Sequence, residues 1–171
     1  MNLLRGLPGH PSHPPLTDAT IGIYTFATVA AVLSKLGIAE EAFAQAWWLA
    51  LIVGLVTTLF TASTGFLDWL QISRGTPLWR TATVHLSVML LATVIFAITA
   101  GAGNAGYDDR EVTTAMLILT LIGFGTLTVG GWLGGAITYV HGMRVLNLVE
   151  EPATRAASPV PKPEKEAADR S

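Results

Sequence analysis

The sequence predicts an all-α integral membrane protein, a four-helix bundle with up-down-up-down order, and three observations lead to this prediction. Several apolar segments are long enough to cross a bilayer, which takes about 20 residues. Charged residues make up only 13% of the 171 residues, about half of the roughly 25% that is usual in soluble domains. The connections between the apolar segments are short, and short connections join antiparallel neighbours.

Each predicted span has ends that the sequence marks. The predicted spans are 16–36, 44–67, 81–100 and 112–141. The first follows Pro14-Pro15, in keeping with the preference for proline at the start of a helix. Aromatic residues fall near the ends of the spans, where amphipathic rings favour the membrane interface; these are Trp47, Trp48, Trp69, Trp79, Tyr107 and Tyr139.

Two terminal segments flank the predicted membrane domain, which covers 16–148. Residues 1–15 form an N-terminal segment without the apolar core of a cleaved signal peptide. Residues 149–171 are rich in Pro, Ala, Lys and Glu, which predicts a disordered tail. The chain contains no cysteine, so disulfides, thiolate metal ligands and cysteine catalysis are excluded.

The distribution of charge predicts the orientation of the protein in the membrane. Most Lys and Arg residues lie on the side shared by both termini and the 70–80 loop. The positive-inside rule then places both termini in the cytoplasm. A net charge of −2 provides no basic surface for nucleic acid, and we exclude that class of partner.

The predicted topology brings every histidine to one end of the bundle. His13 precedes the first span, Asp68 and Trp69 close the second, His85 lies about one turn into the third, and His141 closes the fourth. These residues are far apart in the sequence, yet all fall at the same membrane face. We therefore expect the functional site at this end.

A line of glycines leads to this end along the fourth span. Gly123, Gly130 and Gly134 precede His141 by close to whole helical turns, so one helix face is nearly bare backbone that ends in an imidazole. Such a face admits a close neighbour. The neighbour is either another helix, as in small-x-x-x-small packing, or a flat ligand.

A b-type haem is the ligand that fits these residues. His85 and His141 would be its axial ligands, and Gly130 and Gly134 would form a flat wall for the macrocycle. His13 is a third ligand, a propionate partner or a surface residue.

Other residues at this end are predicted to surround the haem. Asp68 and Trp69 lie beside it, and Arg74 and Arg80 are the expected partners of Asp68, with a haem propionate as an alternative partner.

Two other interpretations use the same residues. Each histidine could be an interfacial hydrogen-bonding residue in a purely structural bundle. Alternatively, His13, His85 and His141 could bind Zn²⁺ or another transition metal, because imidazole and carboxylate groups suit such ions.

Several motifs resemble one family of membrane proteins. They are His13-Pro14-Pro15-Leu16, Thr64-Gly65-Phe66-Leu67-Asp68-Trp69, Gly130-Gly131-Trp132-Leu133-Gly134-Gly135 and Tyr139-Val140-His141-Gly142. Over roughly 13–145 the chain resembles the domain of unknown function 2231 family of small bacterial membrane proteins. The resemblance implies a four-helix, multi-pass domain in the bacterial cytoplasmic membrane. It also implies Rieske-type or cytochrome redox partners, and such a Rieske partner would be a separate protein.

The sequence thus predicts a small membrane electron-transfer protein or redox-complex subunit that binds haem b, rather than a free-standing enzyme. The alternatives are a non-catalytic structural or assembly subunit of a larger membrane complex, and a histidine-based metal-binding membrane protein. In each case the lipid bilayer is the immediate surrounding.

Haem between His85 and His141 predicts a coloured protein. Its dithionite-reduced optical spectrum would show an α-band, and either His85→Ala or His141→Ala would remove that band while the fold stays intact. A colourless protein from haem-replete cells would contradict this expectation.

Overall fold

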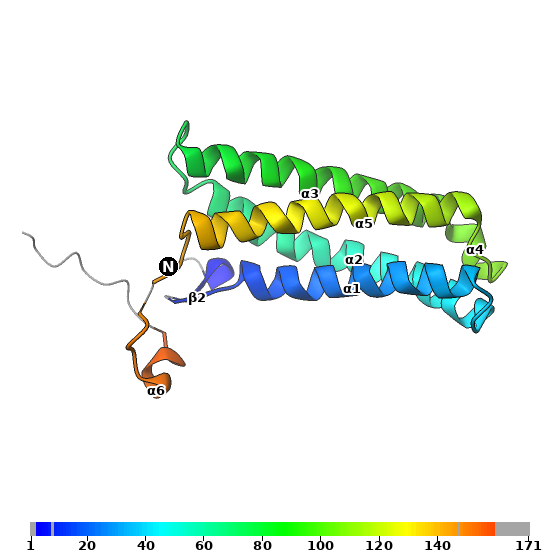
Figure 1. Ribbon diagram of the computed structural model, residues 1–171, viewed down its shortest axis with the longest axis horizontal. Coiled ribbons are helices and arrows are strands. Elements are labelled where there is room, and N and C mark those ends of the chain that lie inside the picture. Colours follow the sequence, from blue (N-terminus) through cyan, green and yellow to red (C-terminus); the bar gives the residue numbers. More distant parts are fainter. Residues whose placement is uncertain (1–2, 8, 147, 160–171) are drawn as a thin grey trace, which may run out of the picture.

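The computed structural model describes residues 3–7, 9–146 and 148–159, and within them four long helices lie side by side (Figure 1). They are α1 (His13–Lys35), α2 (Glu40–Trp69), α3 (Pro77–Ala102) and α5 (Thr114–Gly135), which a π-helical turn, η2 (Ala136–Val140), extends. Each is long and apolar enough to cross a membrane. The predicted all-α membrane bundle is confirmed.

Short elements lie beyond the two ends of the four long helices. They are η1 (Leu3–Arg5), β1 (Gly6–Leu7), β2 (His10–Pro11), α4 (Asn104–Asp108) and α6 (Ala153–Ala156). The two strands pair antiparallel. Figure 1 places β2 and α6 at the end where α1 begins, and α4 at the opposite end.

The helix starts follow local sequence rules. α1 begins at His13 rather than at 16, because Pro14 and Pro15 fit the first turn of a helix. The side chain of Thr76 accepts a hydrogen bond from the backbone N–H of Trp79 at 3.2 Å and so caps α3. α2 continues to Trp69, so Asp68 lies in its last turn.

Hydrogen bonds join the ends of neighbouring helices. α1 packs against α2 and α5, and α3 packs against α5 and α2. Nδ1 of His13, at the start of α1, lies 3.1 Å from the carbonyl oxygen of Thr61, near the end of α2. The indole N–H of Trp48, near the start of α2, donates to the carbonyl oxygen of Ala100, near the end of α3, at 2.9 Å. These are the contacts of neighbours that run in opposite directions.

The largest buried side chains of the bundle are aromatic. The rings of Tyr24 and Phe96 stack with centroids 4.0 Å apart. Gly54 leaves room for Tyr24, since a Cβ there would lie 2.6 Å from the Tyr24 ring. Trp47 is fully buried and donates to Thr120 Oγ1 at 3.0 Å. It is a core residue, and the prediction that it belongs to an interfacial belt is wrong.

The glycine face of α5 receives side chains of α3. A Cβ on Gly123 would lie 2.8 Å from the ring of Phe96, and one on Gly134 would lie 3.3 Å from His85. A Cβ on Gly130 would overlap the Met89 sulfur.

The same glycine face therefore serves helix packing. The three α3 side chains that enter it, Phe96, Met89 and His85, are spaced so that each meets one glycine.

The predicted tail, 149–171, is described in part. Its first residues include α6 and an ion pair between Arg155 and Glu151 at 2.9 Å. Residues 160–171 lie outside the described residues. Near the other terminus, the predicted segment 1–15 contains η1, the two strands and the first turn of α1.

Gly123→Ala is expected to lower the free energy of unfolding by about 1–3 kcal/mol, because the Phe96 ring must shift in a filled core. Gly125→Ala on the same helix is the matched control. Within the described part of the chain no atom of a neighbouring element lies within 4 Å of a Cβ at Gly125, so that variant should match or slightly exceed the wild type. Denaturant unfolding in detergent measures both. Equal destabilisation by the two variants would contradict the packing role of Gly123.

Candidate functional site

The candidate site is the end of the bundle where α1 begins and α2 ends, which we call the histidine end. It is defined by His13, Asp68, His85 and His141. These residues come from α1, α2, α3 and the residue that follows η2. The structure therefore brings together at one end the residues that the sequence analysis singled out.

His13 is held by α2 on two sides. Its Nδ1 lies 3.1 Å from the carbonyl oxygen of Thr61 and 3.3 Å from Thr64 Oγ1. Its ring packs against the backbone of Gly65, where a Cβ would lie 2.6 Å away. A carbonyl oxygen only accepts, so Nδ1 donates, and in the neutral imidazole Nε2 keeps its lone pair.

His85 is held by α5 in the same manner. Its Nδ1 donates to the carbonyl oxygen of Gly130 at 2.8 Å, and its ring lies against Gly134. The same argument assigns the lone pair to Nε2. Among the described residues, neither Nε2 of His13 nor that of His85 has a hydrogen-bond partner. His13 and His85 lie near each other at this end of the bundle.

His141 occupies a different position. Its Nε2 shares a hydrogen bond of 3.0 Å with Thr81 Oγ1, and Thr81 precedes His85 by one turn of α3. The described contacts thus join His85 to Gly130 and His141 to Thr81. A ligand shared by His85 and His141 stays a prediction.

Asp68 forms the charged centre of the histidine end. It is buried, with 7% of its surface exposed. Its Oδ1 accepts from Nε of Arg5 at 2.8 Å and from Nη1 of Arg144 at 2.6 Å. The charges of Asp68 and Arg144 also act on His13.

The prediction that Arg74 and Arg80 pair with Asp68 is wrong. Both are exposed, and neither forms an ion pair within the described residues. The chain turns back after η2 through Gly142 and Arg144, both at positive φ. This reversal allows Arg144 to reach Asp68.

Trp69 faces a separate part of the histidine end. Its indole N–H donates to Thr83 Oγ1 at 3.0 Å, and its ring centroid lies 5.7 Å from that of Phe66 and 6.2 Å from that of Trp79. It joins the end of α2 to the start of α3. Its predicted contact with a cofactor stays a prediction.

A shared site for a metal ion gains no support from the geometry. In the part of the chain that the structure describes, no three His, Cys, Asp or Glu side chains are close enough together to hold one. Binding of a transition metal by His13, His85 and His141 together therefore stays a prediction.

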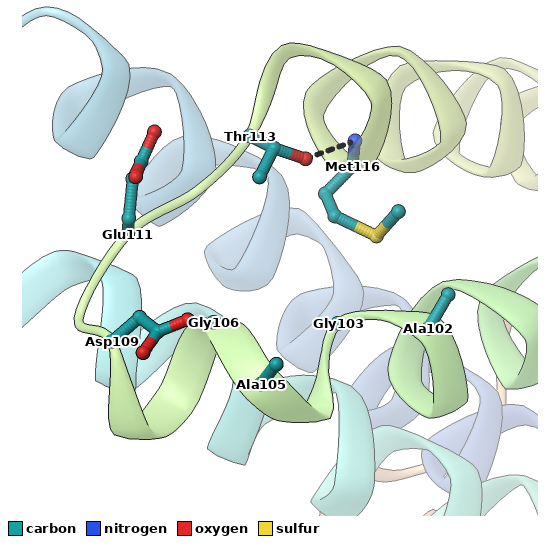
Figure 2. Close-up of a pocket in the computed structure, with 8 residues that line it drawn as sticks. All are labelled: Ala102, Gly103, Ala105, Gly106, Asp109, Glu111, Thr113 and Met116. Atoms are coloured by element: carbon teal, nitrogen blue, oxygen red, sulfur yellow. Dashed lines mark hydrogen bonds between the residues drawn. The ribbon is translucent and has the colours of Figure 1, made fainter.

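A cleft of about 230 Å³ lies at the opposite end of the bundle. Figure 2 shows the end of α3, α4 and the start of α5 around it. Its polar side chains are Asp109, Glu111 and Thr113, and Thr113 Oγ1 accepts from the backbone N–H of Met116 at 3.3 Å. Its volume is below the roughly 300 Å³ at which ligand pockets usually begin.

Sequence reasoning missed the roles of Arg5, Arg144, Thr61 and Gly65. The glycine before Arg144, Gly142, is a signal for a chain reversal, and it could have placed Arg144 near the bundle end. Thr61 and Gly65 are one turn apart on α2, a spacing that marks a shared face. We find no local signal for Arg5.

The four apolar helices and their ion-paired polar end define the class, an all-α integral membrane protein. Over residues 9–147 the chain matches the model of the family described as predicted membrane protein (DUF2231). The chain belongs to this family, and the resemblance of its motifs is confirmed. Neither a curated protein nor a solved structure matches the chain.

Asp68→Asn is expected to lower the free energy of unfolding by about 2–3 kcal/mol, the range for lost hydrogen bonds to a charged group, because two partly exposed guanidinium groups lose their counter-charge. Asp18→Asn is the control. Asp18 is exposed and forms no ion pair with any described residue, so its change should stay within about 0.5 kcal/mol. Denaturant unfolding in detergent decides the matter, and an Asp68→Asn protein as stable as the wild type would refute the role of this carboxylate.

Proposed function

We propose that the protein is a membrane electron-transfer protein or redox-complex subunit that holds a b-type haem through His13 and His85. One observation carries the proposal. Each imidazole donates Nδ1–H to a backbone carbonyl of a neighbouring helix, and each Nε2 has no partner among the described residues. A backbone carbonyl on the far nitrogen is the usual orienting contact of a ligating histidine.

The donor set fits a haem iron. Two neutral imidazoles from different helices of a bundle are common axial ligands. His13 belongs to α1 and is held by α2, whereas His85 belongs to α3 and is held by α5. The two imidazoles that would hold a haem therefore come from the two halves of the bundle.

The glycines take a different role in this proposal from the one that the sequence predicted. Met89 and His85 already occupy the face of Gly130 and Gly134. Gly134 would make room for the imidazole of His85, as Gly65 does for the imidazole of His13. The glycines would then not form a wall against the macrocycle.

A haem with two imidazole ligands supplies one-electron transfer. The residues of this chain orient the imidazoles and place the charged pair of Asp68 and Arg144 next to His13. Electron exchange would involve a Rieske-type or cytochrome partner, or other subunits of a membrane complex. Under the positive-inside rule the histidine end faces the cytoplasm, in a bacterial cytoplasmic membrane.

A non-catalytic structural or assembly subunit is the second candidate. The observation that favours it is the close fit of Phe96, Met89 and His85 into the glycine face of α5. In that case His13, His85 and His141 serve only to fix the bundle end through their hydrogen bonds.

Optical spectra of the purified protein, oxidised and dithionite-reduced, separate the two candidates. We expect a reduced α-band that His13→Ala and His85→Ala each remove. His141→Ala is the matched control and should keep the band, because His141 bonds to Thr81 instead. Circular dichroism verifies that each variant keeps its helices.

Two results would contradict the proposal. A colourless wild-type protein from haem-replete cells would favour the structural subunit. Loss of the band in His141→Ala but not in His13→Ala would show that His85 and His141 are the ligands, as the sequence predicts.

A further inference from the structure

The arginines at the histidine end carry more positive charge than their partner neutralises. Arg5 and Arg144, which we call the arginine pair, both donate to the same oxygen, Oδ1 of Asp68. Within the described residues these are their only ion pairs. One carboxylate faces two guanidinium groups, so the cluster has an excess of one positive charge.

The arginine pair also has unused hydrogen-bond donors. A guanidinium group carries five N–H bonds. In the described part of the chain, Arg5 donates through Nε and Arg144 through Nη1 alone. About a quarter of each side chain is exposed, 27% for Arg5 and 25% for Arg144. The remaining donors can therefore reach a ligand at the surface.

Asp68 holds the arginine pair in place before any ligand arrives. Only 9% of its side chain is exposed, so this anchor lies inside the bundle end. A guanidinium group that is already ordered loses little freedom when it binds an anion.

The backbone around Arg144 departs from ordinary geometry to reach this position. Arg144 has a φ of 60°, in the left-handed region that residues with a side chain seldom adopt. Strain of this kind persists where the surrounding structure holds it, and it often marks a functional site. Here the ion pair to Asp68 holds it.

The arginine pair contacts Asp68 in the last turn of α2, at the end of the bundle where the candidate spans of α1 and α2 stop, at His13 and Trp69. In a bilayer of ordinary thickness the ends of such spans lie near the membrane surface. Lipid phosphates lie at that level, next to the hydrocarbon core. Arginine binds phosphate through two parallel N–H bonds, and basic pockets between membrane helices bind anionic headgroups.

We propose that Arg5 and Arg144, anchored by Asp68, bind an anionic phosphate group, supplied by the headgroup of a lipid such as phosphatidylglycerol. The proposal does not rest on haem binding at His13 and His85, although Asp68 and Arg144 lie near His13. It would tie the N-terminal segment and the segment after η2 to the lipid at one end of the bundle.

Native mass spectrometry of the full-length protein in a zwitterionic detergent tests the proposal. Phosphatidylglycerol and phosphatidylcholine with identical acyl chains are added in separate arms. We expect the wild type to retain phosphatidylglycerol more strongly than phosphatidylcholine. Arg5→Gln and Arg144→Gln should each weaken that retention about tenfold, the loss of one charge-assisted contact. Arg74→Gln, an exposed arginine in the connection between α2 and α3, should bind as the wild type does.

A third arm adds inorganic phosphate at constant ionic strength to protein that carries phosphatidylglycerol. Displacement of the lipid by phosphate at a similar concentration would overturn the assignment to a lipid, in favour of a free anion. Equal retention of the two lipids by the wild type would overturn the site itself. So would folded Arg5→Gln and Arg144→Gln proteins that retain phosphatidylglycerol fully. Circular dichroism establishes folding, and Arg5→Gln alone decides the test if Arg144→Gln does not fold.

Discussion

The entry of α3 side chains into the glycine face of α5 sets the position of every long helix. Phe96 meets Gly123, where a Cβ would come within 2.8 Å of the ring, and His85 meets Gly134, where a Cβ would make a tight contact of 3.3 Å. In a membrane such close fit replaces the hydrophobic force that joins helices in water. Phe96 also stacks on Tyr24 of α1, and Tyr24 in turn lies against Gly54 of α2. The glycine face thus sets the spacing of the whole bundle and fixes the ring of His85.

Both halves of the bundle combine a close fit on glycine with hydrogen bonds. α3 and α5 add the bond from His85 to Gly130 to the glycine face, and α1 and α2 add side-chain bonds between Thr20 and Thr61 at 2.8 Å and between Tyr24 and Thr58 at 3.1 Å. Hydroxyl groups within a bilayer need such partners because no water is available. The halves meet at the histidine end, where His13 belongs to one and His85 to the other. Each imidazole donates Nδ1–H to the backbone of its own half, His13 to α2 and His85 to α5.

The sequence was sufficient to place the candidate site but not to assign its pairs. Helix lengths and short connections brought His13, Asp68, His85 and His141 to one end, and the structure has them there. The partners of Asp68 were missed, because Arg80 follows Asp68 by only 12 residues in the sequence but lies exposed near the start of α3. Arg144 reaches Asp68 instead, through a backbone reversal at positive φ.

The sequence by itself determined the membrane class, the family, the four spans and the end of the bundle at which the histidines gather. These features follow from the length, composition and order of consecutive residues. Only the tertiary structure decided that Trp47 is a core residue, that α3 side chains occupy the glycine face, and that Arg5 and Arg144 are the partners of Asp68. Such choices depend on how far each helix is rotated about its axis. That rotation is set by the sum of contacts with other helices. It cannot be predicted from spans that are apolar on almost every face, because such spans lack a distinct apolar stripe.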